Sequence, residues 1–425
     1  MLGNMFQHFY TVTDTVIVSR GLGVDALAAL GSVDWYTYLI LGVVQAITQG
    51  FAILVAQRFG AGDEKAMQRA YWQALVMTVG LGLALTAAAL LSVFPSLILL
   101  QVPDSIRPLA RTYVLILFAG VPAQMLFNFT ASMLRALGNS RTPLHAMIVS
   151  SLVNIGLDLL FVLTFRWGVA GAAIATVIAQ LMAGAWCTRS MLSIPSFRVS
   201  WKESRNLGTE NGLRMQLLRL CSPLVLQNFV ISVGGMIVVH VVNGLGVNFI
   251  AGYTATNKLY GMLEGAGIAY GFAMVTYIGQ NYGAQKWDRI RQGYKAAMLI
   301  GFATSTIIGA VMIFFGHQIG SIFLPGNTQQ VVEAKKTAYQ YLVIMGSMLP
   351  ILYVLHVTRS TLQGLGDTVT TMASGIAEFV MRTFMALVVS RFLGGASIMY
   401  GEVAAWLGAD LVLVRSLIRH LRTDR

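Results

Sequence analysis

The sequence predicts an all-α integral membrane protein, with twelve transmembrane helices in two pseudo-symmetric six-helix lobes around a central cavity. Three observations lead to this fold class: an apolar composition, a series of membrane-length apolar segments, and an internal repeat. Hydrophobic residues make up 56% of the 425 residues and charged residues only 11%. A soluble domain carries about 25% charged residues. The composition therefore excludes a water-soluble fold.

The apolar segments are each about as long as the ~20 residues that cross a hydrocarbon core as a helix. In chain order the predicted spans are 1–19, 33–57, 71–94, 109–133, 143–165, 169–192, 216–243, 249–279, 293–315, 338–361, 371–391 and 396–417. Met1 opens almost directly into the first span, so we expect its helix to be short or its start to be truncated.

Basic residues in the connections between these spans are unevenly divided. Alternate connections hold 20 Lys and Arg residues on one side, Arg359 among them, and seven on the other. Because cytoplasmic loops carry such an excess, we expect a multi-pass protein of the cytoplasmic (inner) membrane with both termini in the cytoplasm. The same bias accounts for the net charge of +12, so nucleic acid is not an expected partner.

A sequence repeat relates the two halves of the chain. The tetrapeptide Gly-Leu-Gly-Val at 21–24 recurs at 244–247, and Gln-x-x-Gly-Ala at 57–61 recurs at 280–284, both shifted by 223 positions. Leu-x-x-Leu-Gly then recurs with a shift of 228, ending at Gly138 and Gly366. Duplicated membrane bundles are typical of alternating-access transporters.

The only long polar stretch divides these halves. We expect an amino-terminal lobe at 1–192, a cytoplasmic linker at 193–215 and a carboxy-terminal lobe at 216–425. Each lobe has an even number of spans, so both enter the membrane from the same side and the repeats are parallel.

Catalytic motifs are absent from the sequence. It contains no HExxH, GxSxG, Walker A or GxGxxG pattern in a suitable context. We therefore expect a protein that is not an enzyme and has no cofactor. Active transport would then be driven by a coupling ion, sodium or a proton.

Buried acids carry the strongest functional signal in the first lobe. Asp14 lies in the first span, Asn154 and Asp158 share one helix face at i and i+4 in the fifth, and Thr176 lies in the sixth. A carboxylate at mid-bilayer costs roughly 2.5–3.5 kcal/mol on insertion scales, so it normally faces a cavity or a partner. Two such acids close together cannot both stay ionised unaided. They predict a site for a proton or a small cation, although a structural role at helix breaks is an open alternative.

The second lobe places its charges differently. Glu378 and Arg382 form an i,i+4 pair in the favourable order, which predicts a static ion pair. Lys258, Glu264 and Glu402 are further candidates for the cavity or for ion pairing.

The chain resembles the multidrug and toxic compound extrusion (MATE) family, bacterial type, through motifs along nearly its whole length. These are Thr13-Asp14-Thr15 with Gly21-Leu22-Gly23, the segments 57–63, 135–143 and 168–173, and in the second half 280–284 and 363–368. The resemblance implies an antiporter that exports organic cations or drugs in exchange for sodium or protons, acting as a monomer in the lipid bilayer.

By matching positions, the resemblance assigns cation coupling to Asp14, Asn154, Asp158 and Thr176, which would also be the metal ligands if sodium is the ion. Gln7, Tyr10 and Asn128 would form the surrounding network. One departure is that the seventh span and the tenth, around Leu352, carry no carboxylate, whereas some members have a second acid pair there.

Two alternatives remain at this point. A lipid-linked oligosaccharide flippase shares the broad architecture, but it would need a cationic cavity for pyrophosphate, whereas the cluster found here is acidic. A membrane scaffold without transport would leave the buried acids without a role.

Overall fold

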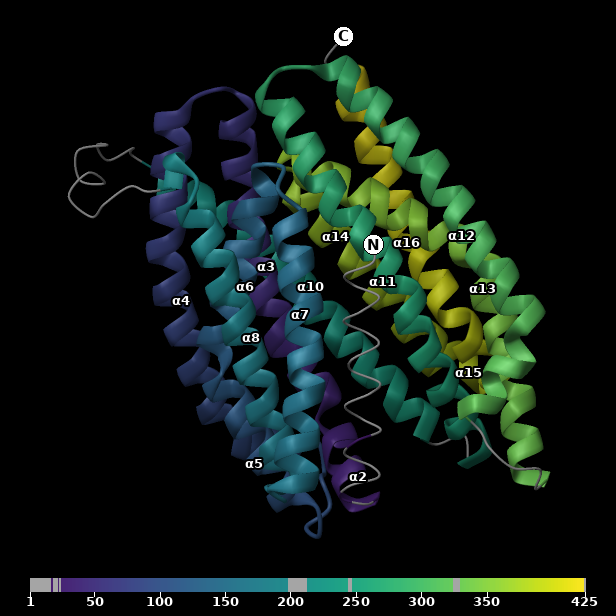
Figure 1. Cartoon of the computed structure of the whole chain (residues 1–425). Helices are drawn as coiled ribbons and strands as arrows, with labels where there is room; N and C mark the ends of the chain where they lie inside the picture. The colour runs from purple at the N-terminus through teal and green to yellow at the C-terminus, as the bar shows by residue number, and fades with distance from the viewer. Residues whose placement is uncertain are drawn as a thin grey trace. The chain divides into compact units, whose positions relative to one another are not determined.

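The fold was obtained as a computed structural model, which describes residues 17, 22, 24–197, 212–243, 247–323 and 329–423 (Figure 1). Every element in these residues is a helix. The α-helices are α2 (Val24–Ser32), α3 (Asp34–Gly60), α4 (Glu64–Leu99), α5 (Arg107–Ala119), α6 (Val121–Ala136), α7 (Arg141–Asp158), α8 (Gly168–Leu192), α10 (Leu213–Asn243), α11 (Val247–Gly283), α12 (Trp287–Phe323), α13 (Gln329–Leu365), α14 (Thr368–Phe384), α15 (Ser390–Leu393) and α16 (Gly395–Thr423). Two π-helices, η1 (Leu159–Thr164) and η3 (Met385–Val389), and a short 3-10 helix, η2 (Pro195–Phe197), complete the set.

Nine of the predicted spans coincide with membrane-length apolar helices, while 109–133 coincides with a bent pair and 249–279 with a helix that is not among these nine. Nine helices in the described residues are long and apolar enough to cross a membrane, or ten if the bent pair α5–α6 counts as one span. The predicted span 249–279 corresponds to α11, a helix of 37 residues. The predicted span 1–19 lies outside the described residues, except for Ile17. Most of the predicted linker, 198–211, also lies outside them.

The fourth predicted span is not one straight helix. It is divided at Gly120 into α5 and α6, which are bent by 45°. Pro122 lies in the first turn of α6, where the backbone N–H that proline lacks would have no helical partner. Inside one continuous helix over 107–136 the same proline would break a hydrogen bond, so a helix boundary just before it is favoured. The predicted span 109–133 thus corresponds to two helices that meet at a bend.

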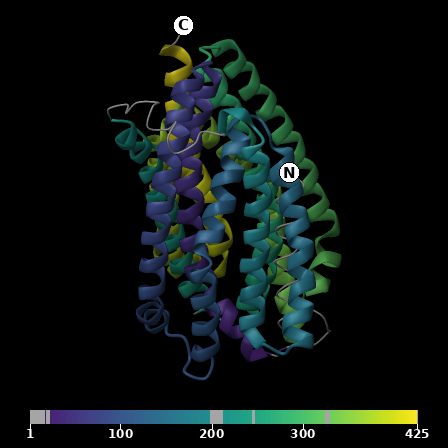
Figure 2. The same ribbon diagram turned by 60° about the vertical axis from the view of Figure 1, so that its left-hand side comes forward.

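The chain packs as two compact units, Leu2–Val225 and Leu226–Arg425, which are described separately here. In the first, α8 packs against α5, α6 and α7, and α3 packs against α4 and α6 (Figures 1 and 2). Seven of the ten buried residues of α8 are Ala or Gly. Small residues let helix backbones approach closely, and a Cβ on Gly184 would lie 3.1 Å from the backbone nitrogen of Phe127. This close packing holds α8 against α6.

The second unit is built around α13, which contacts α11, α12, α14 and α16. Its core holds large side chains that are fully buried, including Tyr341, Tyr353 and Trp406. Where α12 crosses α13, the backbones touch: a Cβ on Gly309 would lie 2.2 Å from the carbonyl oxygen of Gly346. Only glycine fits at this crossing.

The Gly309→Ala substitution should therefore destabilise the protein by about 1–3 kcal/mol, because the added methyl forces the two backbones apart. Gly80→Ala is the matched control: it is also a helix-interior glycine, but nothing lies within 4 Å of an added Cβ, so it should be neutral or stabilising by up to about 1 kcal/mol. Melting temperatures of the purified protein in detergent check this. Equal stability of the two variants would contradict the assigned crossing.

The repeat seen in the sequence is present in the backbone. Gly138 and Gly366 end equivalent helices with positive φ values of 88° and 91°. Each is followed by a backbone N–H that bonds five residues back, Asn139 to Leu134 and Asp367 to Leu362, which is the Schellman helix end.

The repeat continues beyond these helix ends. A second pair of positive-φ glycines lies at the start of the last helix of each half: Gly168 is the first residue of α8, Gly394 directly precedes α16, and one π-helix lies before each of them. This repeat in the backbone supplies a residue-by-residue correspondence between the halves.

Candidate functional site

Three of the four predicted coupling residues converge in the amino-terminal unit. Asn154 and Asp158 lie in the last turns of α7, with exposed fractions of 1% and 0%. With the Asn154 amide oriented so that both of its polar atoms have partners, its nitrogen donates to Asp158 Oδ2 at 3.3 Å and its oxygen accepts from the Thr176 backbone N–H at 3.3 Å. The Thr176 hydroxyl donates to the carbonyl of Ala172 on its own helix. The helices α7 and α8 thus bring Asn154, Asp158 and Thr176 together, and their role in ion coupling stays a prediction.

A small polar cavity adjoins this cluster. It has a volume of about 20 Å³ and is lined by Phe127, Met147, Ser150, Ser151, Asn154, Thr176, Ala179 and Gln180. This is close to the smallest volume that holds one water molecule. The Gln180 side-chain oxygen is buried with no hydrogen-bond partner among the described residues. The cavity therefore offers oxygen atoms and room for one small species.

The sequence did not single out Ser150, Ser151 or Gln180. Ser150 lies four residues before Asn154 and Gln180 four residues after Thr176, so extending each predicted helix face by one turn would have found both. Asp158 is directly followed by the π-helix η1. π-helical turns inside α-helices occur frequently at functional sites.

The other residues predicted for the first lobe are not part of the described cluster. Asp14, Gln7 and Tyr10 lie outside the described residues. Asn128 is half-buried on α6 and donates to the carbonyl of Gln124 on its own helix at 2.9 Å. The role of these four residues remains a prediction.

The carboxy-terminal unit holds a buried charge network that extends beyond the predicted ion pair. Arg382 Nη2 donates to Glu402 Oε2 at 2.7 Å and lies 3.8 Å from Glu378 Oε2. Arg359 Nη2 donates to Glu378 Oε1 and, at 3.1 Å, to the Ser374 hydroxyl. The side chains of Arg359, Glu378, Arg382 and Glu402 are between 6% and 16% exposed. These four residues, on α13, α14 and α16, are called the charge network below.

Arg359 extends the sequence-based interpretation. The sequence places it among the basic residues of the inner connections, and the structure adds that its side chain is 11% exposed and pairs with Glu378. The apolar run of α13 ends close to Arg359, so the sequence pattern alone resembles a flanking charge.

Glu264 and Lys258 are the two remaining candidates in this unit. Glu264 on α11 is half-buried, with Oε1 3.8 Å from Nε2 of His356 on α13. The side chain of Lys258 lies outside the described residues, although its backbone belongs to α11. In the described part of the chain, no group of three or more His, Cys, Asp or Glu side chains could hold a metal ion.

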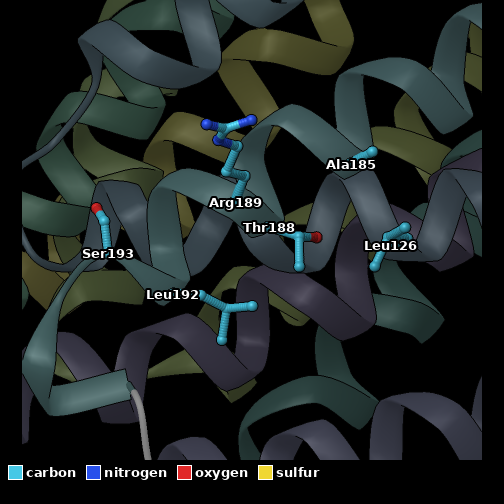
Figure 3. A pocket seen from close by; sticks show the side chains of 6 residues that line it. All are labelled: Leu126, Ala185, Thr188, Arg189, Leu192 and Ser193. Carbon is cyan, nitrogen blue, oxygen red and sulfur yellow. The ribbon is translucent and has the colours of Figure 1, made fainter.

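A larger hollow lies at the carboxyl end of α8 but does not have the chemistry of an ion site. It has a volume of about 650 Å³ and is lined by Leu126, Ala185, Thr188, Arg189, Leu192 and Ser193 (Figure 3). Its lining is mainly apolar, and its single charged group is a cation. The buried Asn154–Asp158–Thr176 cluster is therefore the better candidate site.

A bundle of membrane-spanning helices with a buried polar site and an internal duplication defines a membrane transporter rather than an enzyme. The MatE family model matches residues 1–160 and 223–388. The chain thus belongs to the MatE family of multidrug and toxic compound extrusion (MATE) transporters, as the sequence resemblance predicted.

Relatives and solved structures agree with this family. The chain is 27% identical over 423 residues to the probable multidrug resistance protein YpnP of Bacillus subtilis, covering 96% of this chain and 92% of the relative. It is 27% identical over 334 residues to the probable multidrug resistance protein YoeA of the same organism, covering 76% and 71%. A crystal structure of MATE in complex with MaL6 superposes with a TM-score of 0.91 at 22% identity, covering 100% of this chain and 95% of that chain. The predicted all-α, twelve-helix membrane fold is confirmed by this likeness.

Proposed function

We propose that this transporter is a cation-coupled antiporter that exports organic cations, drugs among them, by alternating access in exchange for sodium or protons. The single observation that carries the proposal is the fully buried Asp158, held beside Asn154 and Thr176 next to a cavity of about 20 Å³. A buried carboxylate in a membrane helix normally marks an ion or proton pathway.

The chemistry of the site supports either coupling ion. Carboxylate, amide and hydroxyl oxygens suit a hard cation such as sodium; amide and hydroxyl groups line the cavity, and the Asp158 carboxylate adjoins it through Asn154. A proton on Asp158 would remove the same charge. The sequence adds Asp14 as a second carboxylate, and two acids at one site favour holding a single shared cation or proton.

Coupling follows from charge neutralisation. A buried negative charge is costly in a low dielectric until a cation or proton neutralises it, so ion binding changes the relative free energies of the transporter's conformations. An ion can shift that equilibrium only through different affinities for the two states. We infer that ion entry from outside favours release of the cationic substrate.

The remaining features of the proposal concern the setting of the protein. It would act as a monomer in the cytoplasmic membrane with both termini in the cytoplasm. The flippase alternative is not favoured, because the relatives described above are multidrug resistance proteins by name.

Dye transport in proteoliposomes tests the proposal. A fluorescent organic cation is loaded, and sodium and pH gradients are imposed separately. We expect one of the two gradients, without any nucleotide, to drive the dye against its concentration gradient. The absence of uphill dye movement under both gradients would reject cation-coupled antiport.

A further inference from the structure

We propose that Arg382 is a resident cation in the carboxy-terminal unit, where its guanidinium fills the repeat-equivalent of the coupling-ion site and keeps that site closed to exchangeable ions. The proposal takes the coupling ion of the first unit from the proposed function. It adds that the second unit binds no coupling ion, because the Arg382 guanidinium is a permanent cation at the equivalent site.

The repeat places the two sites in register. Counted from the equivalent glycines Gly138 and Gly366, Asn154 and Arg382 occupy the same position, 16 residues on. Counted from Gly168 and Gly394, the same holds for Thr176 and Glu402, which lie eight residues on.

The contacts repeat as well as the positions. In the first unit the side chain of Asn154 meets the backbone of Thr176, and in the second the side chain of Arg382 meets that of Glu402. The same two helices of each half therefore build both sites. The charge network is not an unrelated ion pair but the second copy of the candidate ion site.

A third correspondence extends the comparison. Ser150, which lines the cavity of the first unit, is 228 positions before Glu378. A neutral serine, amide and threonine in one half are thus replaced by Glu378, Arg382 and Glu402 in the other. Each neutral group has been exchanged for a charged one.

Space at the two sites differs accordingly. The first site has a cavity of about 20 Å³. The pocket at the second, lined by Val238, Arg382, Ala386, Ile398, Gly401 and Glu402, leaves about 0 Å³ for a water-sized molecule. The guanidinium occupies the place where a small ion would otherwise fit.

The seventh span makes room for this side chain. With the shift of 223 that relates Gly21 to Gly244, the residue equivalent to Asp14 is Ile237, so the seventh span has no acid there, and Gly234 lies about one turn before it. A Cβ on Gly234 would lie 3.7 Å from Arg382 Nη1 and 3.8 Å from its Cδ. A carboxylate side chain at this position would compete with Arg382 for the same space.

The net charge of the charge network depends on Arg382. The four members of the charge network, two arginines and two glutamates, carry no net charge among themselves, and Glu264 and Asp410 are further acids close enough to interact with them. A buried charge without a partner is strongly disfavoured and is neutralised by an ion or a proton. Removing the guanidinium alone would leave one excess negative charge, and the site should then take up a small cation.

The test is cation binding by full-length protein in detergent, comparing Arg382→Gln with the charge-balanced double variant Arg382→Gln/Glu402→Gln. Both are also made in an Asp158→Asn background, which removes the candidate ion site of the first unit. Radioactive sodium measures sodium binding, and the infrared carbonyl band of protonated carboxyl groups measures proton binding. Melting temperatures are recorded with and without sodium and at neutral and acidic pH.

We expect Arg382→Gln to bind about one more cation per chain than its parent, in either background, and the double variant to bind none in addition. Melting of Arg382→Gln should also rise with sodium or acid by more than melting of the parent or the double variant. A folded Arg382→Gln protein that gains neither a sodium ion nor a protonated carboxyl overturns the proposal. So does an Arg382→Gln protein that neither sodium nor acid allows to fold, because a small cation should replace the guanidinium.

The design separates this proposal from the proposed function. Sodium or proton binding that persists in Asp158→Asn with Arg382 intact would place an exchangeable ion in the second unit and reject the resident-cation role. Failure of gradient-driven dye transport with a gain of cation binding in Arg382→Gln would instead reject antiport alone.

Discussion

Replacing Asp158 by Asn should reduce gradient-driven dye extrusion by about 100-fold or more, because losing a buried ionic partner costs about 3–5 kcal/mol and each 1.4 kcal/mol is a factor of ten. The substitution keeps the shape of a side chain that is fully buried at the end of α7. It removes the negative charge that a coupling ion would neutralise. The amide should still form the contact with Asn154, so the fold should persist.

The matched control is Asp104→Asn, the same chemical change at a carboxylate whose side chain is 88% exposed. Its surface ion pair with Arg107 is worth at most about 1 kcal/mol, and extrusion should stay at the wild-type rate. Proteoliposomes with equal amounts of inserted protein are compared under an imposed gradient. Wild-type extrusion by Asp158→Asn would remove Asp158 from the coupling site.

The second large effect is on stability. Glu378→Gln should lower the free energy of unfolding by about 3–5 kcal/mol, the cost of removing one partner from a buried ion pair. Glu378 is 6% exposed on its side chain and lies between Arg359 and Arg382. Without its charge, two guanidinium groups share one remaining carboxylate, that of Glu402.

Unfolding of the purified protein in mixed micelles measures this change. Asp288→Asn, at a carboxylate 90% exposed and 3.4 Å from Arg291, is the control and should change stability by less than about 1 kcal/mol. Adding Arg359→Gln to Glu378→Gln restores neutrality and should recover part of the loss, as coupled neighbours do. If Glu378→Gln unfolds at the same denaturant concentration as the wild type, the members of the charge network are not energetically coupled.

Sequence patterns were enough to expect Asn154, Asp158 and Thr176 close together, because the signals of these residues are local. Asn154 and Asp158 are one helical turn apart in an otherwise apolar segment, and Thr176 follows at a matching depth. The cavity beside them was not predictable, since it depends on how Phe127 of α6 and Gln180 of α8 pack against α7. Asp14 lies outside the described residues, so its part in the site remains a prediction.

Long-range partners were the main omission. The i,i+4 relation between Glu378 and Arg382 was visible, but nothing local links Glu378 to Arg359, 19 residues away on another helix. The bend at Gly120 was also missed, because the apolar run continues through it and only Pro122 marks the break. Pairings between helices and breaks inside apolar runs depend on packing, which periodicity does not report.

The glycine crossing of α12 and α13 has a mechanical consequence. With the backbones in contact at Gly309 and Gly346, sliding of one helix along the other would bring side chains into collision, so shear at this interface is blocked. α13 carries Arg359, and α12 is 37 residues long, about 55 Å at 1.5 Å per residue. Motion of the part of α13 around Gly346 should therefore carry α12 with it, whereas Pro350 lies between this crossing and Arg359 and interrupts the helix hydrogen bonding there.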